Sequence, residues 1–332
     1  MSSVTLRTTR MMNEHPFTMT WTTADIPDLD GRTAVVTGAN GGLGLETARA
    51  LAAAGSTVVL AARSQDKTDA AVATIRSETP TARLDVVALD LGSLDAVRTA
   101  AATIAERHPA IDVLVNNAGL MGLPESVTVD GNEMQFGVNH LGHFLLTNRL
   151  LPALAAAGGR VVTVTSTAHH MGRRVDPANP NLEGRYGPWK AYGQSKLANY
   201  HFAIGLHERL QAAGSSVASL LAHPGLSNTD LQTHSVAATE GGRSQRFFEV
   251  LAQRTGMPPS RGALPQLRAA TDSAARSGQF YAPRWVNSGP PVVRPLLRRL
   301  GMARSIEVLW EVSERLTGEP FDVAARLATA TR

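Results

Sequence analysis

A serine, a tyrosine and a lysine in one stretch of the chain have the side chains that proton transfer at a carbonyl or an alcohol requires. Ser166 follows an apolar run, and three residues separate Tyr192 from Lys196. On a helix those two positions share a face one turn apart, so the Lys196 ammonium can approach the Tyr192 phenol. A nearby cation stabilises phenolate and lowers the tyrosine pKa from about 10 toward the working pH of a general acid and base. Tyr-x-x-x-Lys also occurs by chance in packed helices, so the interpretation depends on the elements that precede it.

Short apolar runs alternate with Ala-rich stretches of helical periodicity from Gly31 onward. Continuous apolar strands that alternate with helices predict a parallel sheet covered on both faces. With right-handed crossovers this is an α/β fold, a three-layer doubly wound parallel sheet (Rossmann fold) of about seven strands with helices on both faces. The expected strands are Thr33-Thr37, Thr57-Ala62, Leu84-Leu89, Ile111-Asn116, Arg160-Thr165, Ser216-Ala222 and Gln279-Tyr281. The expected helices are Leu43-Ala54, Gln65-Glu78, Leu94-Arg107, Asn132-Ala156, Lys190-Ala213 and Gly262-Ser273.

Three glycines stand directly after the first expected strand and at the opening of the first expected helix, namely Gly38, Gly42 and Gly44. Glycine there permits a tight turn and a close approach of the backbone to phosphate, and the helix N-terminus offers free N-H groups and a positive dipole end. A Gly-rich turn can also be a simple connection, but its place between strand and helix favours a dinucleotide site.

Further motifs follow this turn in a consistent order. They are "ALDLGS", "NNAG", "FGVNHLGHF", Ser166, Tyr192-x-x-x-Lys196 and Pro224-Gly225. With them, residues 30 to about 285 resemble the short-chain dehydrogenase/reductase (SDR) superfamily. The stretches "VNHLGHF", "STAHH", "SKLAN", "FYAPRW" and "LWEVSERLTG" are similar to its branch of retinol dehydrogenases and protochlorophyllide reductase.

This resemblance implies roles for the candidate residues. Tyr192 would give its proton to the carbonyl oxygen during reduction, with oxidised nicotinamide as a second positive charge beside Lys196. Ser166, at the end of a strand, can bind the substrate oxygen. Asn139 would hold a water that connects Lys196 to solvent; the alternative is an Asn that satisfies backbone groups in a helix. The expected cofactor-binding residues are Gly38, Asn40, Gly42, Leu43, Gly44, Arg63, Asp90, Leu91, Asn116, Ala118, Gly119, Tyr192, Lys196, Pro224, Gly225 and Thr229.

The end of the second expected strand indicates the cofactor. An acidic residue there would bind the ribose 2′-hydroxyl and repel a 2′-phosphate. Here Ala62 takes that place and Arg63 follows with a guanidinium suited to phosphate. The sequence therefore favours NADP(H), unless Arg63 is only a surface charge, and Asp90 would accept from the adenine amino group.

Composition and charge restrict the other classes of function. The 332 residues include no Cys, so neither a disulfide framework nor a thiolate metal site can form. The net charge is +4 and aromatic residues make up 5%, without the basic stripe of a nucleic-acid-binding protein.

Residues 1–20 lack the apolar core of a signal peptide and no long apolar run follows, so we expect no membrane span and a cytoplasmic, soluble protein. No metal is expected: His140 and His143 would pack along a helix, and His169 and His170 would flank the pocket.

Residues 1–20 are expected to be an extended or disordered segment, and residues 21–332 are expected to form a single domain. Within this domain we expect a substrate lid over about 226–275, which includes Phe247 and Phe248, and a helical C-terminal extension over about 290–332. The sequence thus predicts an NADP(H)-dependent oxidoreductase that interconverts a carbonyl and an alcohol, on a medium or bulky, mostly apolar small molecule. A C=C reductase using the same site and a dinucleotide-binding sensor without turnover are the alternatives. A homodimer or homotetramer through the helices Asn132-Ala156 and Lys190-Ala213 would fit the resemblance, although packing onto the sheet explains their apolar positions equally well.

Overall fold

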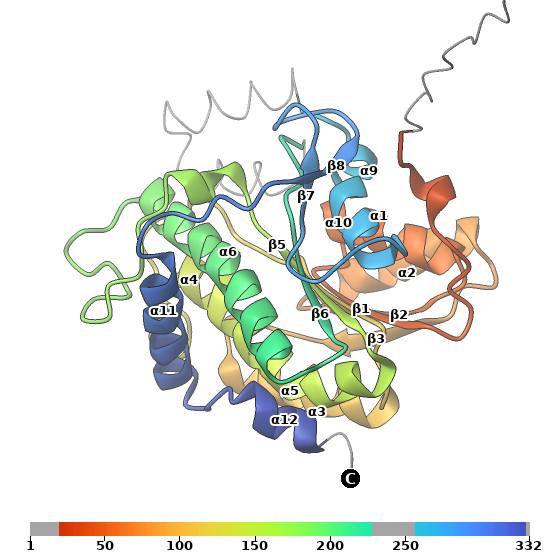
Figure 1. Cartoon of the computed structure of the whole chain (residues 1–332). Coiled ribbons are helices and arrows are strands. Elements are labelled where there is room, and N and C mark those ends of the chain that lie inside the picture. Colours follow the sequence, from red (N-terminus) through yellow and green to blue (C-terminus); the bar gives the residue numbers. More distant parts are fainter. Residues whose placement is uncertain (1–19, 228–255, 330–332) are drawn as a thin grey trace, which may run out of the picture.

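The computed structural model describes residues 20–227 and 256–329 (Figure 1). Nearly all of the expected N-terminal extension and most of the expected lid, with Thr229, Phe247 and Phe248, lie outside the described residues. The strands are β1 (Thr33–Thr37), β2 (Thr57–Ala62), β3 (Leu84–Ala88), β4 (Val113–Asn116), β5 (Arg160–Val164), β6 (Ala218–Ala222), β7 (Phe280–Pro283) and β8 (Pro291–Arg294). The longer helices are α1 (Gly42–Ala53), α2 (Gln65–Glu78), α3 (Leu94–Arg107), α5 (Gly142–Ala157), α6 (Pro188–Ala212), α10 (Leu264–Thr271), α11 (Met302–Thr317) and α12 (Val323–Thr329). The short helical turns are η1 (Thr23–Asp25), α4 (Met134–Phe136), η2 (Gly137–Leu141), η3 (Thr167–His170) and α9 (Pro259–Gly262).

The strands form one sheet in the order β3-β2-β1-β4-β5-β6-β7-β8, parallel from β3 through β7. Side chains of successive strand residues enter two different apolar cores. In β1, Ala34 and Val36 pack on the side of α1, α2 and α10, and Val35 packs on the side of α3, α5 and α6. Figure 1 shows these two groups of helices on opposite faces of the sheet. The three-layer doubly wound fold expected from the sequence is therefore confirmed.

The sheet has one strand more than the seven expected. β8 pairs with β7 in an antiparallel register that places Pro291 opposite Pro283. Proline lacks the N–H that a central strand needs, so "GPPVV" is typical of a loop. At the edge of the sheet that donor is dispensable, which is why a strand can begin at Pro291.

The helix expected over Asn132-Ala156 is not continuous. It consists of α4, the π-helical turn η2 and α5, and the Glu133 carboxylate caps its start by accepting from the backbone N–H groups of Gln135 and Phe136. Close packing requires glycine at both ends of the turn: a Cβ at Gly137 would lie 2.5 Å from Thr128 Cγ2, and one at Gly142 would lie 2.7 Å from the Leu91 carbonyl oxygen. One additional residue in a single turn leaves the apolar pattern almost unchanged, so the sequence did not reveal it.

The C-terminal segment returns to the helices of one face. α11 packs along α6, and α12 packs on α5, so that Trp310 and Phe321 lie against Phe144 and Phe202. The apolar positions of α5 and α6 are thus covered by the sheet and by the same chain. No helix in the two described ranges combines the length and apolarity that crossing a bilayer takes.

Part of the expected lid belongs to the core. In α10, Leu267 and Ala270 are buried in the apolar cluster beside α1, and the helix contacts β5, β6 and β7. Its residues are not among those that line the cavity described below.

Candidate active site

The glycine turn between β1 and α1 forms one wall of a cavity at the carboxyl ends of the strands. Gly38 and Gly42 have φ angles of +66° and +51°, which residues with a Cβ rarely adopt. A Cβ at Gly44 would overlap the Gly38 carbonyl oxygen and lie 2.7 Å from Asn117 Nδ2. No side chain caps the N-terminus of α1, so its N–H groups and dipole can receive an anion. This turn fits the pyrophosphate of a dinucleotide.

The close packing at Gly44 leads to a first prediction. Gly44→Ala is expected to weaken NADPH binding by about tenfold or more and to lower the melting temperature, because the added methyl pushes the turn away from Gly38, and such overpacking costs about 1–3 kcal/mol. Gly187→Ala is the matched control, since its Cβ would meet only Lys190 Cβ, at 3.6 Å. Cofactor fluorescence titration and thermal unfolding measure both effects. Equal NADPH affinity in the two variants would contradict the role given to Gly44.

The cavity has a volume of about 410 Å³ and collects most of the residues predicted from the sequence. Those that line it are Gly38, Asn40, Gly42, Leu43, Gly44, Arg63, Asp90, Leu91, Ala118, Gly119, Ser166, Tyr192, Lys196, Pro224 and Gly225. The sequence analysis missed Gly41, Ala61, Ser64, Lys67, Leu89, Asn117, Leu120, Met121, Val138, Val164, Thr165, Thr167, Leu226, Ser227 and Asn287. Most of these are immediate neighbours of predicted residues.

Asn116 does not line the cavity, although the sequence analysis placed it in the cofactor site. It is the last residue of β4, is 1% exposed, and its Nδ2 donates to Thr147 Oγ1 at 2.9 Å. The next residue, Asn117, lines the cavity, and its Nδ2 donates to the Thr37 carbonyl at 2.9 Å. Because side chains alternate along an extended segment, the two asparagines point in opposite directions.

The end of β5 and helix α6 bring Ser166, Tyr192 and Lys196 to the same cavity. The Ser166 side chain lies close enough to the Tyr192 phenol to lower its pKa, and Lys196 Nζ lies 5.8 Å from the centroid of the Tyr192 ring. Thr165 Oγ1 donates to the Lys196 carbonyl at 2.8 Å, which fixes α6 to the end of β5. Tyr192 and Lys196 are 5% and 4% exposed, so a substrate oxygen beside them would be largely shielded from water.

Asn139 lies behind this group and does not itself line the cavity. Its Oδ1 accepts from the Leu120 N–H at 2.7 Å, and its Nδ2 donates to the Leu120 carbonyl and to Ser195 Oγ, both at 2.9 Å. A Cβ on Gly119 would lie 3.1 Å from Asn139 Oδ1 and 3.3 Å from Lys196 Nζ. Asn139 therefore holds the loop after β4 against α6, next to Lys196, and the water expected there stays a prediction.

Burial determines the protonation of the two titratable groups. Burial raises the pKa of Tyr192 above its usual 10, and the hydrogen bond with Ser166 lowers it only in part. Burial also lowers the pKa of Lys196 to about 8. The pKa of Tyr192 in the protein alone is thus raised, not lowered as the sequence pattern suggested, because burial desolvates the phenolate.

His143 connects the turn η2 to the cofactor wall. Its Nδ1 lies 3.0 Å from the Asn139 carbonyl, and its Nε2 lies 2.8 Å from Thr37 Oγ1. A carbonyl only accepts, so Nδ1 carries the hydrogen; burial lowers the pKa of His143 to about 4, and the neutral ring then accepts from the Thr37 hydroxyl. That hydroxyl in turn accepts from the N–H groups of Asn117 and Ala118 at 2.9 and 3.0 Å. Sequence reasoning expected only packing and a hydrogen bond for His143.

The other end of the cavity carries positive charge. Arg63 and Ser64 follow β2, and Lys67 lies in the first turn of α2. Ala62, where an acidic residue was sought, lines the wall beside them. Asp90 Oδ1 accepts from the Gly92 N–H at 2.9 Å, which shapes the turn after β3. Two cations beside a hydroxyl, without an acidic residue at the strand end, suit a phosphate ester on the ribose.

Two further histidines, His169 and His170, are engaged with neighbouring rings. His169 stacks on Tyr200 with ring centroids 4.6 Å apart and lies 4.0 Å from the ring centroid of His170. Within residues 20–227 and 256–329, no three His, Asp or Glu side chains converge in the manner of metal ligands.

Comparisons with known proteins agree with this arrangement. The family model for short chain dehydrogenase matches residues 32–240. Human retinol dehydrogenase 13 is 46% identical over 208 residues, which are 62% of this chain and 62% of that protein. Mouse polyprenol dehydrogenase is 39% identical over 305 residues, 88% of this chain and 86% of that protein. A solved structure from Mycobacterium paratuberculosis is 41% identical, has a TM-score of 0.74, and covers 91% of this chain and 99% of its own.

The match to the first of these relatives therefore spans less than two thirds of that protein's length. The family match begins just before β1 and contains the glycine turn, the loop after β4, Ser166, Tyr192 and Lys196. The chain belongs to the short-chain dehydrogenase/reductase family, in its retinol dehydrogenase-like branch.

Proposed function

We propose that this protein is an NADP(H)-dependent oxidoreductase that interconverts a carbonyl and an alcohol on a medium or bulky, mostly apolar small molecule. The observation that carries the proposal is that Tyr192, Lys196 and Ser166 line the same cavity as the glycine turn of α1. A hydride donor bound at that turn and a proton donor on α6 would thus both reach the same substrate molecule.

When bound, NADPH supplies the hydride that reduces the carbonyl carbon. The protein's own groups act on the oxygen. The Ser166 hydroxyl binds and orients it, and Tyr192 gives it a proton. Because burial raises the pKa of Tyr192, the phenol is protonated at neutral pH and available as a donor. Lys196, with a pKa of about 8, is charged at pH 7 and can return a proton to the phenolate.

The names of the relatives, retinol dehydrogenase and polyprenol dehydrogenase, denote alcohol substrates, which supports carbonyl and alcohol chemistry over reduction of a C=C bond. The experiment that tests the proposal is NADPH consumption by the purified protein with a panel of aldehydes, ketones and enones of increasing size. Oxidation of NADPH with the larger aldehydes or ketones is the expected result. Turnover of enones alone would indicate a C=C reductase, and cofactor binding without any turnover would indicate a sensor.

The cofactor preference gives a second prediction. Arg63→Ala is expected to weaken NADPH binding by about 1–3 kcal/mol, the size of a charge-assisted contact, and to leave NADH binding nearly unchanged. NADH serves as the internal control, because it shares every group except the 2′-phosphate. Fluorescence titration of the two cofactors gives both affinities. Equal weakening of the two would show that Arg63 does not read the phosphate.

A further inference from the structure

The C-terminal helix α11 contacts the turn that carries Asn139. The adjacent residue, His140, is 1% exposed, and its Nε2 lies 2.8 Å from Ser313 Oγ on α11. The imidazole stacks on Phe136 with centroids 5.2 Å apart and meets the edge of Phe202 at 5.9 Å. His140 is therefore held by rings on two sides and by one hydroxyl from a helix that lies 173 positions later in the chain.

The direction of this hydrogen bond follows from the other contact of Ser313. The Ser313 hydroxyl donates its hydrogen to the Leu309 carbonyl at 2.7 Å, so Ser313 Oγ accepts from His140 Nε2. Burial lowers the pKa of His140 to about 3, and the ring is neutral with its hydrogen on Nε2. Ser313, itself fully buried, is thus the acceptor that fixes the tautomer and the orientation of His140.

A residue of α6 that influences His140 shares a backbone partner with Lys196. Asn199, on α6, lies close enough to the His140 ring to influence its pKa, although its buried Oδ1 has no hydrogen-bond partner. Asn199 Nδ2 donates to the Val164 carbonyl at 3.1 Å, and Lys196 Nζ reaches the same carbonyl at 3.4 Å. One carbonyl at the end of β5 thus connects the Asn199 amide to the ammonium beside Tyr192.

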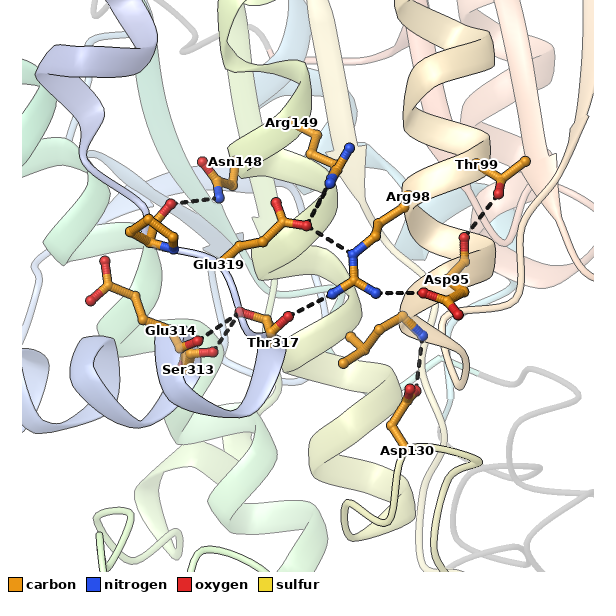
Figure 2. Close-up of polar contacts among 12 residues, drawn as sticks. Asp95, Arg98, Thr99, Asp130, Asn148, Arg149, Ser313, Glu314, Thr317 and Glu319 are labelled. Atoms are coloured by element: carbon orange, nitrogen blue, oxygen red, sulfur yellow. Dashed lines mark hydrogen bonds and ion pairs between the residues drawn. The ribbon is translucent and has the colours of Figure 1, made fainter.

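Ion pairs fix the end of α11 to the main body of the fold. Figure 2 shows Glu319 between Arg98 of α3 and Arg149 of α5, with oxygen-to-nitrogen distances of 2.8 and 2.5 Å. Arg98 also donates to the Thr317 carbonyl at 2.7 Å, and Thr317 Oγ1 donates to the Ser313 carbonyl at 2.7 Å. These contacts fix the position of α11 along its axis, and therefore the position of Ser313. The charged groups are partly buried, so a shift of the helix would break their ion pairs.

We propose that Ser313 and His140 are a positioning pair, through which α11 holds the Asn139 turn and the groups around Lys196 in place for proton transfer. Neither residue lines the cavity, so both act through other residues. The inference rests on the proposed function and extends it to a segment beyond residues 32–240, the part that the family model matches.

The test compares two serines of the same helix. Ser313→Ala removes the acceptor of His140, whereas Ser305→Ala removes a hydroxyl that donates only to the Gly301 carbonyl four positions earlier, at 2.9 Å. We expect Ser313→Ala to lower kcat about tenfold, the effect of one hydrogen bond, with unchanged affinity for NADPH. Ser305→Ala is expected to keep wild-type kcat. A drop in melting temperature in Ser313→Ala with wild-type kcat, or equal kcat losses in both variants, would overturn the proposal.

A second readout does not depend on turnover. The pH dependence with which acetic anhydride labels Lys196, followed by mass spectrometry, reports the pKa of that amine. In Ser313→Ala, the His140 ring loses its hydrogen-bond acceptor and becomes more mobile, which should let water approach Lys196. The pKa of Lys196 should then rise toward its usual value in Ser313→Ala, but not in Ser305→Ala. If no carbonyl compound is turned over, the proposed function fails while this labelling still decides the positioning pair: equal midpoints in the wild type and Ser313→Ala would refute it.

Discussion

Replacing Tyr192 by phenylalanine is expected to lower turnover by about 10²–10⁴-fold, the usual contribution of a general acid, while folding and NADPH affinity persist. The ring is almost fully buried and lies 6.1 Å from the ring of Trp189, and Phe keeps that packing. Only the hydroxyl is lost, and with it the proposed proton donor. Steady-state kinetics on a compound from the carbonyl panel gives kcat, and fluorescence titration gives cofactor affinity.

Tyr200 offers a matched control on the same helix. Its hydroxyl reaches the Leu297 carbonyl at 3.5 Å, away from the cavity lining, so Tyr200→Phe removes a phenolic group of equal size without touching the proposed chemistry. We expect that variant to retain kcat within about threefold, because a weak neutral hydrogen bond contributes about 0.5 kcal/mol. Near wild-type turnover in Tyr192→Phe would refute the acid role, although the fold and the cofactor turn would stand.

The fold could be predicted because its strands carry an unambiguous signal. Runs such as Val58-Val59-Leu60 have to be covered on both faces, and only a sheet between two helical layers does this. β8 gave no such signal, because its prolines are compatible with a strand only at an edge, and the edge position of a strand is decided by the whole sheet. The turn η2 was equally hidden, since its close contacts at Gly137 and Gly142 come from Thr128 and Leu91.

Site residues that belong to a sequence motif could be predicted. Contacts between segments that are distant in the sequence could not. The glycine turn, Ser166, Tyr192 and Lys196 all line the cavity. A motif does not say which of two neighbours points inward, and here Asn117 lines the cavity in place of Asn116. The partners of His140 and His143, Ser313 and Thr37, lie far from them in sequence. The raised pKa of Tyr192 depends on burial, which only the three-dimensional structure provides.

Lowering the pH from 7 to 5 is expected to unfold the protein cooperatively, because buried histidines must take up protons. Burial lowers the pKa of five of them in the folded state, to about 3 or 4: His140, His143, His169, His201 and His223. In the unfolded chain the same side chains titrate near 6.5. Their stabilising contribution is therefore complete above pH 6.5 and is lost as the pH falls toward 4. Neighbouring cations such as Lys196 and Arg174 act in the same direction, since they disfavour charged imidazole.

The size of the effect follows from proton linkage. Each histidine that is neutral when folded and charged when unfolded removes about 1.4 kcal/mol of stability per pH unit, so five remove up to about 7 kcal/mol per unit, which is comparable with the whole stability of a typical domain at about 5–15 kcal/mol. Urea unfolding at a series of pH values between 7 and 5 measures this slope. His201→Gln should reduce the slope by about 1.4 kcal/mol per pH unit, the contribution of one proton. This side chain is one of the five and lies outside the cavity lining. Carboxylates with lowered pKa values, such as Asp85 and Glu319, destabilise the fold only at still lower pH, since their usual pKa is already near 4. A free energy of unfolding that stayed constant from pH 7 to 5 would show that water reaches these histidines in the folded protein.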